Sequence, residues 1–147
     1  MTVLLAALVG VIGWFYWQQT QVDSARTDGL AAARAHAATI LSYDYRHIDA
    51  DIAKGKAATT GKFREEYSQT TSTVVKPTAV QYKAIVQAQV RVASVRSASP
   101  DQVVVLLFVN QTTTSTRVTG PKVDQSRVRM TLEKHGDRWL VSKIDAL

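Results

Sequence analysis

The stretch from Met1 to Trp17 constrains the fold most, because it contains no charged residue and no proline and ends in four consecutive aromatic residues. A helix rises about 1.5 Å per residue, so this stretch and the two glutamines after it cover most of a hydrocarbon core, which needs roughly 17 to 25 apolar residues. Trp14, Phe15, Tyr16 and Trp17 then lie at the membrane–water interface, where aromatic side chains are enriched. The stretch predicts a membrane-spanning helix.

A cleaved signal peptide and a buried core helix are the alternatives to a membrane anchor. No basic segment precedes the apolar stretch, no small-x-small cleavage site follows it, and the aromatic residues stand where cleavage would occur. We therefore expect an uncleaved anchor over residues 1–20, a helical juxtamembrane stalk over 21–29 and one domain over 30–147. The flanking charges leave the direction of the span open, because Arg26 is the first basic residue after it and none precedes it.

One side of the predicted anchor is formed mainly by small residues. Ala6, Gly10, Gly13 and Trp17 follow the spacing i, i+4, i+7 and i+11, which places them on one side of a helix. Small residues let two membrane helices approach closely, and close packing is a main source of association in lipid. This side is a candidate contact for a partner helix in the membrane. Contact with lipid is the alternative, since glycine is common in membrane helices.

The rest of the chain is basic, with a formal net charge of +6 and an isoelectric point near 9.8 for the whole sequence. Such a charge suits an anionic membrane surface or a nucleic acid. No run of basic residues and no motif that combines basic and aromatic residues is present, so we expect no nucleic-acid partner. The chain has no cysteine, which fits an oxidising compartment without disulfides as well as a reducing one.

Three helical segments are predicted before residue 77. Apolar residues recur at helical spacing from Leu30 to Ile48, and a short second helix follows. A third helix begins after Thr60, and Pro77 is expected to end it, because proline removes a backbone donor and restricts the residue before it. The first half of the domain is therefore helical.

Beyond Pro77 the apolar period changes from 3.6 to 2. Residues Val80 to Val92 alternate between apolar and polar, which predicts a long strand with one buried face. The run from Val103 to Val109 is apolar on both faces, as in a central strand that is covered above and below. Two further alternating segments follow, and the short turns between segments require antiparallel pairing.

These patterns predict an α+β domain in which three helices pack on one face of a curved, four-stranded antiparallel sheet. The predicted core contains four large aromatic residues: Phe63, Tyr67, Phe108 and Trp139.

Potential metal ligands and acid–base groups gather in one place, at Asp44, His47, Asp49 and Asp51. His47 and Asp51 have the i, i+4 spacing that places two ligands on one helical face, but no third ligand is indicated elsewhere. Aspartates around a short helix more often cap it. No nucleophile motif and no glycine-rich phosphate loop is present, so we expect neither an enzyme nor a cofactor or metal site.

Several short motifs occur in an order that is similar to one known family: Ser42-Tyr43-Asp44-Tyr45, Asp49-Ala50-Asp51-Ile52, Thr60-Gly61-Lys62-Phe63, Phe108-Val109-Asn110-Gln111-Thr112 and Gly136-Asp137-Arg138-Trp139-Leu140-Val141. Through them the chain resembles the mammalian-cell-entry (Mce) associated membrane proteins of actinobacteria. The resemblance implies a single span in the inner (plasma) membrane and an extracytoplasmic domain with a cone-shaped fold like nuclear transport factor 2 (NTF2) and cystatin. It also implies an accessory subunit of an Mce lipid-import complex, with the permease, Mce-type subunits and the bilayer as partners and no small-molecule substrate of its own.

Two alternatives to this function remain open. Secretion-channel assembly subunits of the VirB8 type share a single anchor and the same cone-shaped fold, and fold analogy alone does not separate them from Mce-associated proteins. The other alternative is a binder of small ligands on the concave side of the sheet. It requires an apolar pocket with convergent polar groups.

Overall fold

The computed structural model describes residues 2–147, and it describes side chains from Val9 onward. The helical elements are α1 (Thr2–Ile40), a 3-10 turn (Tyr45–His47), α2 (Ile48–Ala57), α3 (Gly61–Thr70), a π-helical segment (Thr71–Val75) and α4 (Lys76–Tyr82). The strands are β1 (Tyr43–Asp44), β2 (Ile85–Ala98), β3 (Gln102–Thr114), β4 (Lys122–His135) and β5 (Arg138–Ala146). The chain is thus helical first and β-rich afterwards, as an α+β fold requires.

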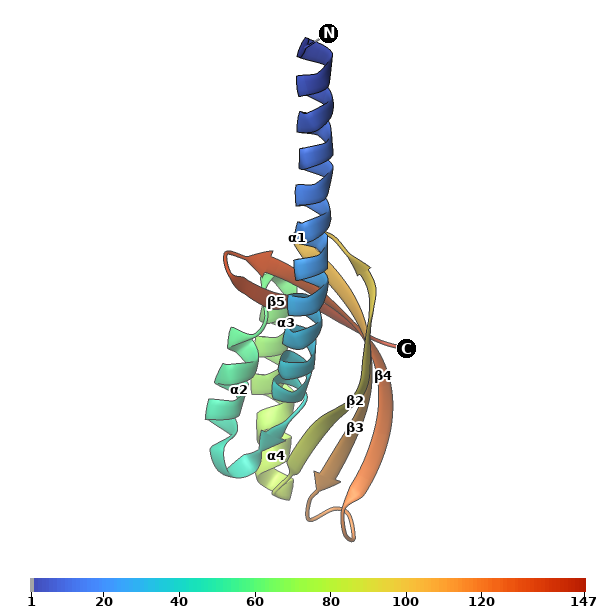
Figure 1. The fold of residues 1–147 in the computed structure, drawn as a ribbon. Coiled ribbons are helices and arrows are strands. Elements are labelled where there is room, and N and C mark those ends of the chain that lie inside the picture. The colour runs from blue at the N-terminus through green and yellow to red at the C-terminus, as the bar shows by residue number, and fades with distance from the viewer. Residues whose placement is uncertain (1) are drawn as a thin grey trace.

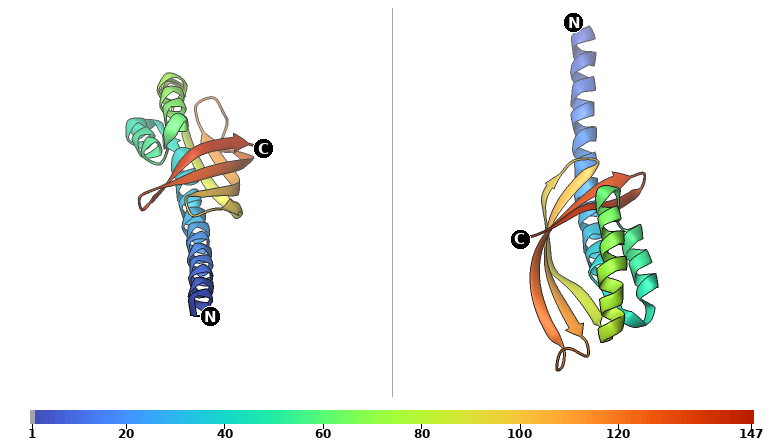
Figure 2. Two further views of the ribbon diagram at one scale, coloured as in Figure 1. Left: turned by 90° about the horizontal axis from the view of Figure 1, so that it is seen from above. Right: turned by 180° about the vertical axis from the view of Figure 1, so that it is seen from behind.

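The strands form one antiparallel sheet in the order β1-β2-β3-β4-β5. The sheet curves, and all helices lie on the same side of it (Figures 1 and 2). The core fills the space between these two layers. Its largest fully buried apolar side chains come from alternate positions of three strands: Val103, Val105, Leu107, Val109, Met130, Leu132 and Val141. The two-residue period of a strand places these residues together on the face that meets the helices.

Helix α1 runs without interruption through the three regions predicted at the N-terminus. Its first half projects beyond the domain, and its second half lies along the sheet (Figure 1). Packing begins at Ala25, which is 3% exposed, and continues through Ala33 and Ala37, which have no exposed surface. Alanine at these positions allows the helix to lie close to β3. The domain packing therefore starts before residue 30.

No helix in the described part of the chain is long and apolar enough to cross a membrane. The predicted anchor includes residues 1–8, whose side chains lie outside the description.

The helix that was expected to end at Pro77 continues to Tyr82, so this prediction is wrong. A π-helical segment precedes Pro77, which stands at the start of α4, where a missing backbone N–H costs little. Strand β2 consequently begins at Ile85 instead of Val80, after Lys83 has turned the chain in the left-handed conformation with φ 49°. The sheet has five strands rather than four, because the two-residue β1 pairs with the start of β2.

Phe108 is not a core residue, in contrast to the prediction. It is 49% exposed, because it lies at an even-numbered position of β3 and the odd-numbered positions face the helices. The apolar run of β3 is therefore covered on one face only. Trp139 is buried, with 6% of its surface exposed, and Phe63 and Tyr67 are partly buried against the same core.

Candidate functional site

The projecting half of α1 exposes a dense group of apolar side chains. Each described large apolar residue of this half is 48% to 73% exposed: Val9, Val11, Ile12, Trp14, Phe15, Tyr16 and Trp17. A β-carbon at Gly10 or Gly13 would have no neighbour within 4 Å. The side chain of Ala6 lies outside the described residues. This surface is apolar on all sides and contacts no other part of the described chain. The predicted contacts of the anchor with a partner helix and with the membrane interface therefore stay predictions.

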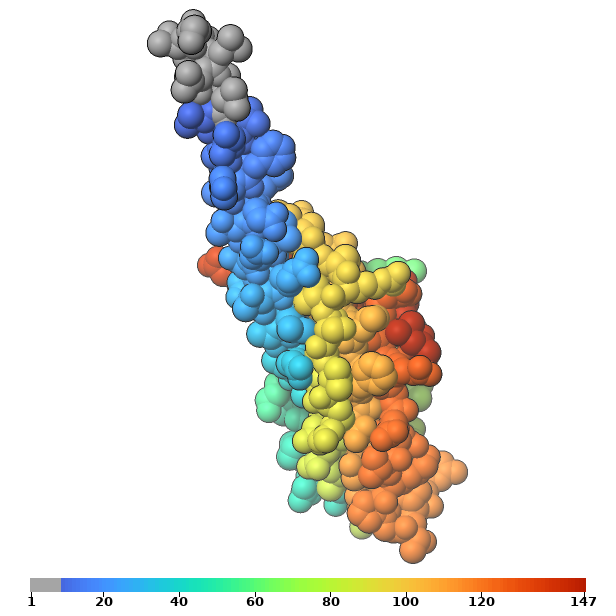
Figure 3. Space-filling model, turned by 45° about the vertical axis from the view of Figure 1, so that its right-hand side comes forward, coloured from blue at the N-terminus to red at the C-terminus, as the bar shows by residue number. Residues whose placement is uncertain are grey.

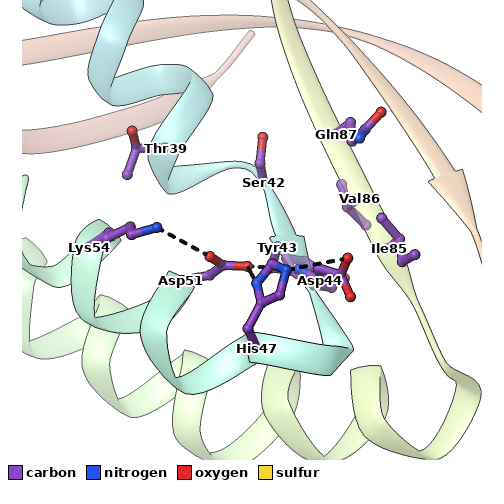
Figure 4. Close-up of a pocket in the computed structure, with 10 residues that line it drawn as sticks. All are labelled: Thr39, Ser42, Tyr43, Asp44, His47, Asp51, Lys54, Ile85, Val86 and Gln87. Carbon is purple, nitrogen blue, oxygen red and sulfur yellow. Dashed lines mark hydrogen bonds and ion pairs between the residues drawn. The ribbon is translucent and has the colours of Figure 1, made fainter.

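A polar cluster of Asp44, Arg46, His47 and Asp51 joins β1 to α2. Figure 4 shows its members Asp44, His47 and Asp51 beside a pocket of about 370 Å³. Asp44 accepts hydrogen bonds from the Arg46 backbone N–H at 2.9 Å and from its guanidinium Nε at 2.9 and 3.0 Å. The Asp44 backbone N–H donates to Asp51 Oδ2 at 3.0 Å, and His47 Nδ1 lies 3.0 Å from the same oxygen. The guanidinium hydrogen bond lowers the pKa of Asp44 from its ordinary value of 3.8 to about 2.

The carboxylates of this cluster bind groups of the chain itself. Asp44 caps the 3-10 turn through the Arg46 backbone N–H, which is an ordinary role of aspartate at the start of a short helix, and it also binds the arginine side chain. Asp51 accepts from the backbone N–H of Asp44. Asp49, the fourth member predicted from the sequence, lies apart and pairs with Lys76 of α4. Within the described residues, no three His, Cys, Asp or Glu side chains gather as a metal-binding group.

We expect the stabilising effect of Asp44 to depend on pH. Because the pKa is lowered in the folded chain, the ionised carboxylate stabilises the fold above about pH 4, and this effect is lost as the pH falls toward about 2. Asp44→Asn keeps a cap acceptor but loses the charge, so it should melt below the unmodified chain at neutral pH. Thermal unfolding of both proteins across this range should show the difference shrinking with acidification. An equal difference at every pH would contradict the assignment.

An apolar pocket of about 360 Å³ lies between the helices and the concave side of the sheet. Phe63 and Tyr67 of α3 line it together with Ile144 of β5. Burial raises the pKa of Tyr67, whose hydroxyl lies so close to α2 that a β-carbon at Gly55 would stand 2.0 Å from it. Among the described residues, the lining contains no charged side chain.

Two polar residues, which the sequence analysis named only as members of short motifs, connect the end of α1 to the sheet. Gln111 Nε2 donates to the carbonyl of Leu41 at 3.1 Å, and Ser42 Oγ accepts from the backbone N–H of Ala88 at 2.9 Å. Gln111 occupies an odd-numbered position of β3, and the odd-numbered positions before it, from 103 to 109, hold valine or leucine. That break in the apolar pattern is the signal in the sequence that sets Gln111 apart from the core residues of β3.

The whole chain, residues 1–147, matches the model of the protein family described as "Uncharacterized protein Rv1363c/MT1408-like". The chain belongs to this family. Rv1362c of Mycobacterium tuberculosis is 36% identical over 139 residues, which cover 91% of this chain but 63% of that protein. A second protein of the same bacterium, named "Outer membrane protein Rv1973", is 35% identical over 147 residues, 98% of this chain and 91% of its own length.

Several solved structures of bacterial proteins have the same fold. An IcmL-like type IV secretion system protein of Legionella pneumophila has a TM-score of 0.70 at 8% identity, covering 83% of this chain and 91% of its own. The VirB8 protein of Agrobacterium tumefaciens has a TM-score of 0.62 at 13% identity, covering 80% and 88%. A periplasmic fragment of TraM has a TM-score of 0.65 at 10% identity, covering 82% and 95%. These similarities establish a VirB8-like, NTF2-like α+β fold and nothing further.

Proposed function

We propose that this chain is a non-catalytic subunit of a multi-protein complex in the cell envelope, held to a membrane through the projecting half of α1. The observation that carries the proposal is the exposure of four consecutive aromatic residues, Trp14 to Trp17, on a helix that extends away from its own domain. Exposed apolar surface of this extent marks a contact with a membrane or another protein. Aromatic side chains at the domain end of the helix suit the interface between lipid and water.

The relatives support an assembly role of the VirB8 type more strongly than an Mce-type role. The IcmL-like structure with this fold is named a type IV secretion system protein, VirB8 has the same fold, and one family relative is named an outer membrane protein. None of the relatives described above carries Mce in its name. We therefore propose an assembly subunit with a single anchor and a domain outside the cytoplasm. This subunit binds protein partners and has no substrate of its own.

The double replacement Gly10→Leu with Gly13→Leu tests the anchor as a contact site. Leucine favours membrane insertion, so the variant should stay in the membrane pellet after an alkaline carbonate wash. Because the leucines fill the side on which small residues allow close helix approach, the variant should no longer migrate with its complex on blue-native gels. Val9→Leu with Ile12→Leu is the matched control, since it adds leucine outside the small-residue side and should keep both properties.

Two results would separate the parts of this proposal. Recovery of the unmodified chain in the wash supernatant would reject the membrane anchor. Full co-migration of the glycine variant would restrict the anchor to a tether, with the domain providing the protein contacts.

A further inference from the structure

The sheet has an outer face that no helix of the described residues covers (Figure 1). Residues opposite one another in the antiparallel register share a face. Four successive rows therefore define this outer face: Gln89–Asn110–Gln125, Val92–Phe108–Arg127, Ser94–Leu106–Arg129–Asp145 and Ser97–Val104–Thr131–Lys143. Strands β2 to β5 lie open along this side of the space-filling view, in yellow to red (Figure 3). The odd-numbered residues of β3 point the other way, into the core.

The centre of the outer face is apolar although it meets solvent. Phe108 is 49% and Val92 54% exposed, and Leu106 and Val104 continue the same line along β3 as half-buried residues. A strand with apolar side chains on both faces is typical of a sheet that is covered twice. Within the described chain, the helices cover the inner face of the sheet only. The outer face is therefore suited to bind a second covering layer from outside this chain.

The borders of the outer face are basic. Arg127, Arg129 and Lys143 lie in its rows, and two register shifts in β2 insert one extra residue each, Arg91 and Arg96. A β-bulge re-aims the side chain at the extra residue and is rarely accidental. One carboxylate, that of Asp145, lies among these five cations and binds both Arg129 and Lys143 at 3.1 Å.

The bulged arginines line two shallow hollows on the outer face. Arg91 and Arg127 flank Phe108 in a hollow of about 670 Å³. Arg96 and Arg129 line a second one of about 470 Å³ beside Val104. Among the ion pairs of the described residues, none includes Arg91, Arg96 or Arg127. The hydrogen bond from Lys143 lowers the pKa of Asp145, which keeps its carboxylate ionised and occupied. Of the three arginines outside these ion pairs, Arg91 and Arg127 lie at the first hollow and Arg96 lies at the second.

We propose that the outer face docks an acidic segment of another protein, with carboxylates in the basic hollows and an apolar residue on Phe108. Arginine and aromatic side chains are enriched in protein interfaces, and complementary charge favours specific partners. A second copy does not fit, because two such faces would oppose arginines to arginines.

A bilayer does not fit the orientation of this face either. This step rests on the proposed function: an anchor along the projecting half of α1 leaves the outer face turned sideways, parallel to the helix axis (Figure 1). A neighbouring subunit of the same complex, standing beside this chain on the membrane, can contact a face with that orientation.

Photo-crosslinking in the host cell tests the proposal on the full chain. With p-benzoylphenylalanine at position 108, mass spectrometry of the cross-linked peptide should identify a protein segment of net negative charge. Arg91→Glu with Arg127→Glu should reduce the yield at least about tenfold, because both charges flank position 108 and opposite charges become like charges. Lys62→Glu with Arg64→Glu, on the exposed surface of α3, is the control with the same change in net charge and should keep the yield.

Three kinds of result would overturn the docking proposal. The first is the absence of any cross-link. The second is a cross-link to a second copy, to lipid or to a segment without net negative charge, and the third is an equal change of cross-link yield in both charge-reversal variants. Vesicles that contain phosphatidylglycerol provide the lipid test: loss of vesicle binding in the Arg91/Arg127 variant without a protein cross-link would assign the face to the membrane. Thermal melting confirms that both variants fold. Carbonate extraction of the same cells reports on the anchor separately, so failure of one proposal is distinguishable from failure of the other.

Discussion

Replacing Trp139 by alanine is expected to lower the free energy of unfolding by about 3 to 5 kcal/mol, the range for truncating a buried aromatic side chain. The indole is 6% exposed at the start of β5 and packs in the main core. Lys134 lies over its ring at 5.9 Å, and His36 Nε2 lies 2.8 Å from the Trp139 carbonyl, so this residue connects β4, β5 and α1. A loss of this size is a large fraction of the stability of a typical domain.

Thermal and denaturant unfolding of the purified chain would measure this loss. Val123→Ala is the matched control, because Val123 is an exposed strand residue and its truncation should change stability by no more than about 0.5 kcal/mol. Equal stability of the Trp139→Ala and Val123→Ala variants would show that the inward face of β5 is assigned wrongly.

The architecture was predictable wherever apolar periodicity is long. Four strands were predicted from the alternation that starts at Val80, the apolar run from Val103 to Val109 and two further alternating segments. The turn at His135 to Asp137 requires β4 and β5 to pair. The α+β class and the buried position of Trp139 follow from the same period. Periodicity is informative because each half-buried element must carry its apolar side chains on one face.

Local departures from regular geometry were not predictable from that pattern. A π-helical segment before Pro77 lets the helix pass a residue that ordinarily stops it. The two-residue β1 is too short to carry a period at all. Phe108 was misplaced because the run from Val103 to Val109 is apolar at every position, so the sequence does not distinguish the covered face from the open one.

The candidate sites were likewise predictable only in part from the sequence. The sequence identified Asp44, His47 and Asp51 as a cluster, since their spacing along the chain is short. It did not identify Arg46 as the partner of Asp44. The outer face depends on which residues of β2 occupy bulges, and register shifts are set by pairing with β3 rather than by local sequence.

Replacing Gly29 by leucine is expected to destabilise the fold by about 1 to 3 kcal/mol or more, the cost of overpacking a filled core. A β-carbon at Gly29 would stand 2.7 Å from Val103 Cγ2 and 2.9 Å from Val103 Cβ. Val103 has no exposed surface and belongs to β3, at the centre of the sheet, so it has little room to move. Glycine is therefore required here for the close approach of α1 to β3, and the gain of about 1 kcal/mol in helix propensity cannot offset the clash.

A double-mutant cycle with Val103→Ala would isolate this contact in unfolding measurements. Val103→Ala removes the methyl groups at 2.7 and 3.1 Å and leaves the β-carbon at 2.9 Å, so the cost of Gly29→Leu should fall in that background without vanishing. Gly13→Leu on the projecting half of α1 is the control, because no atom lies within 4 Å of a β-carbon there and the domain should keep its stability. Additive losses from Gly29→Leu and Val103→Ala would mean that the two positions do not touch, and that α1 lies on the sheet in another register.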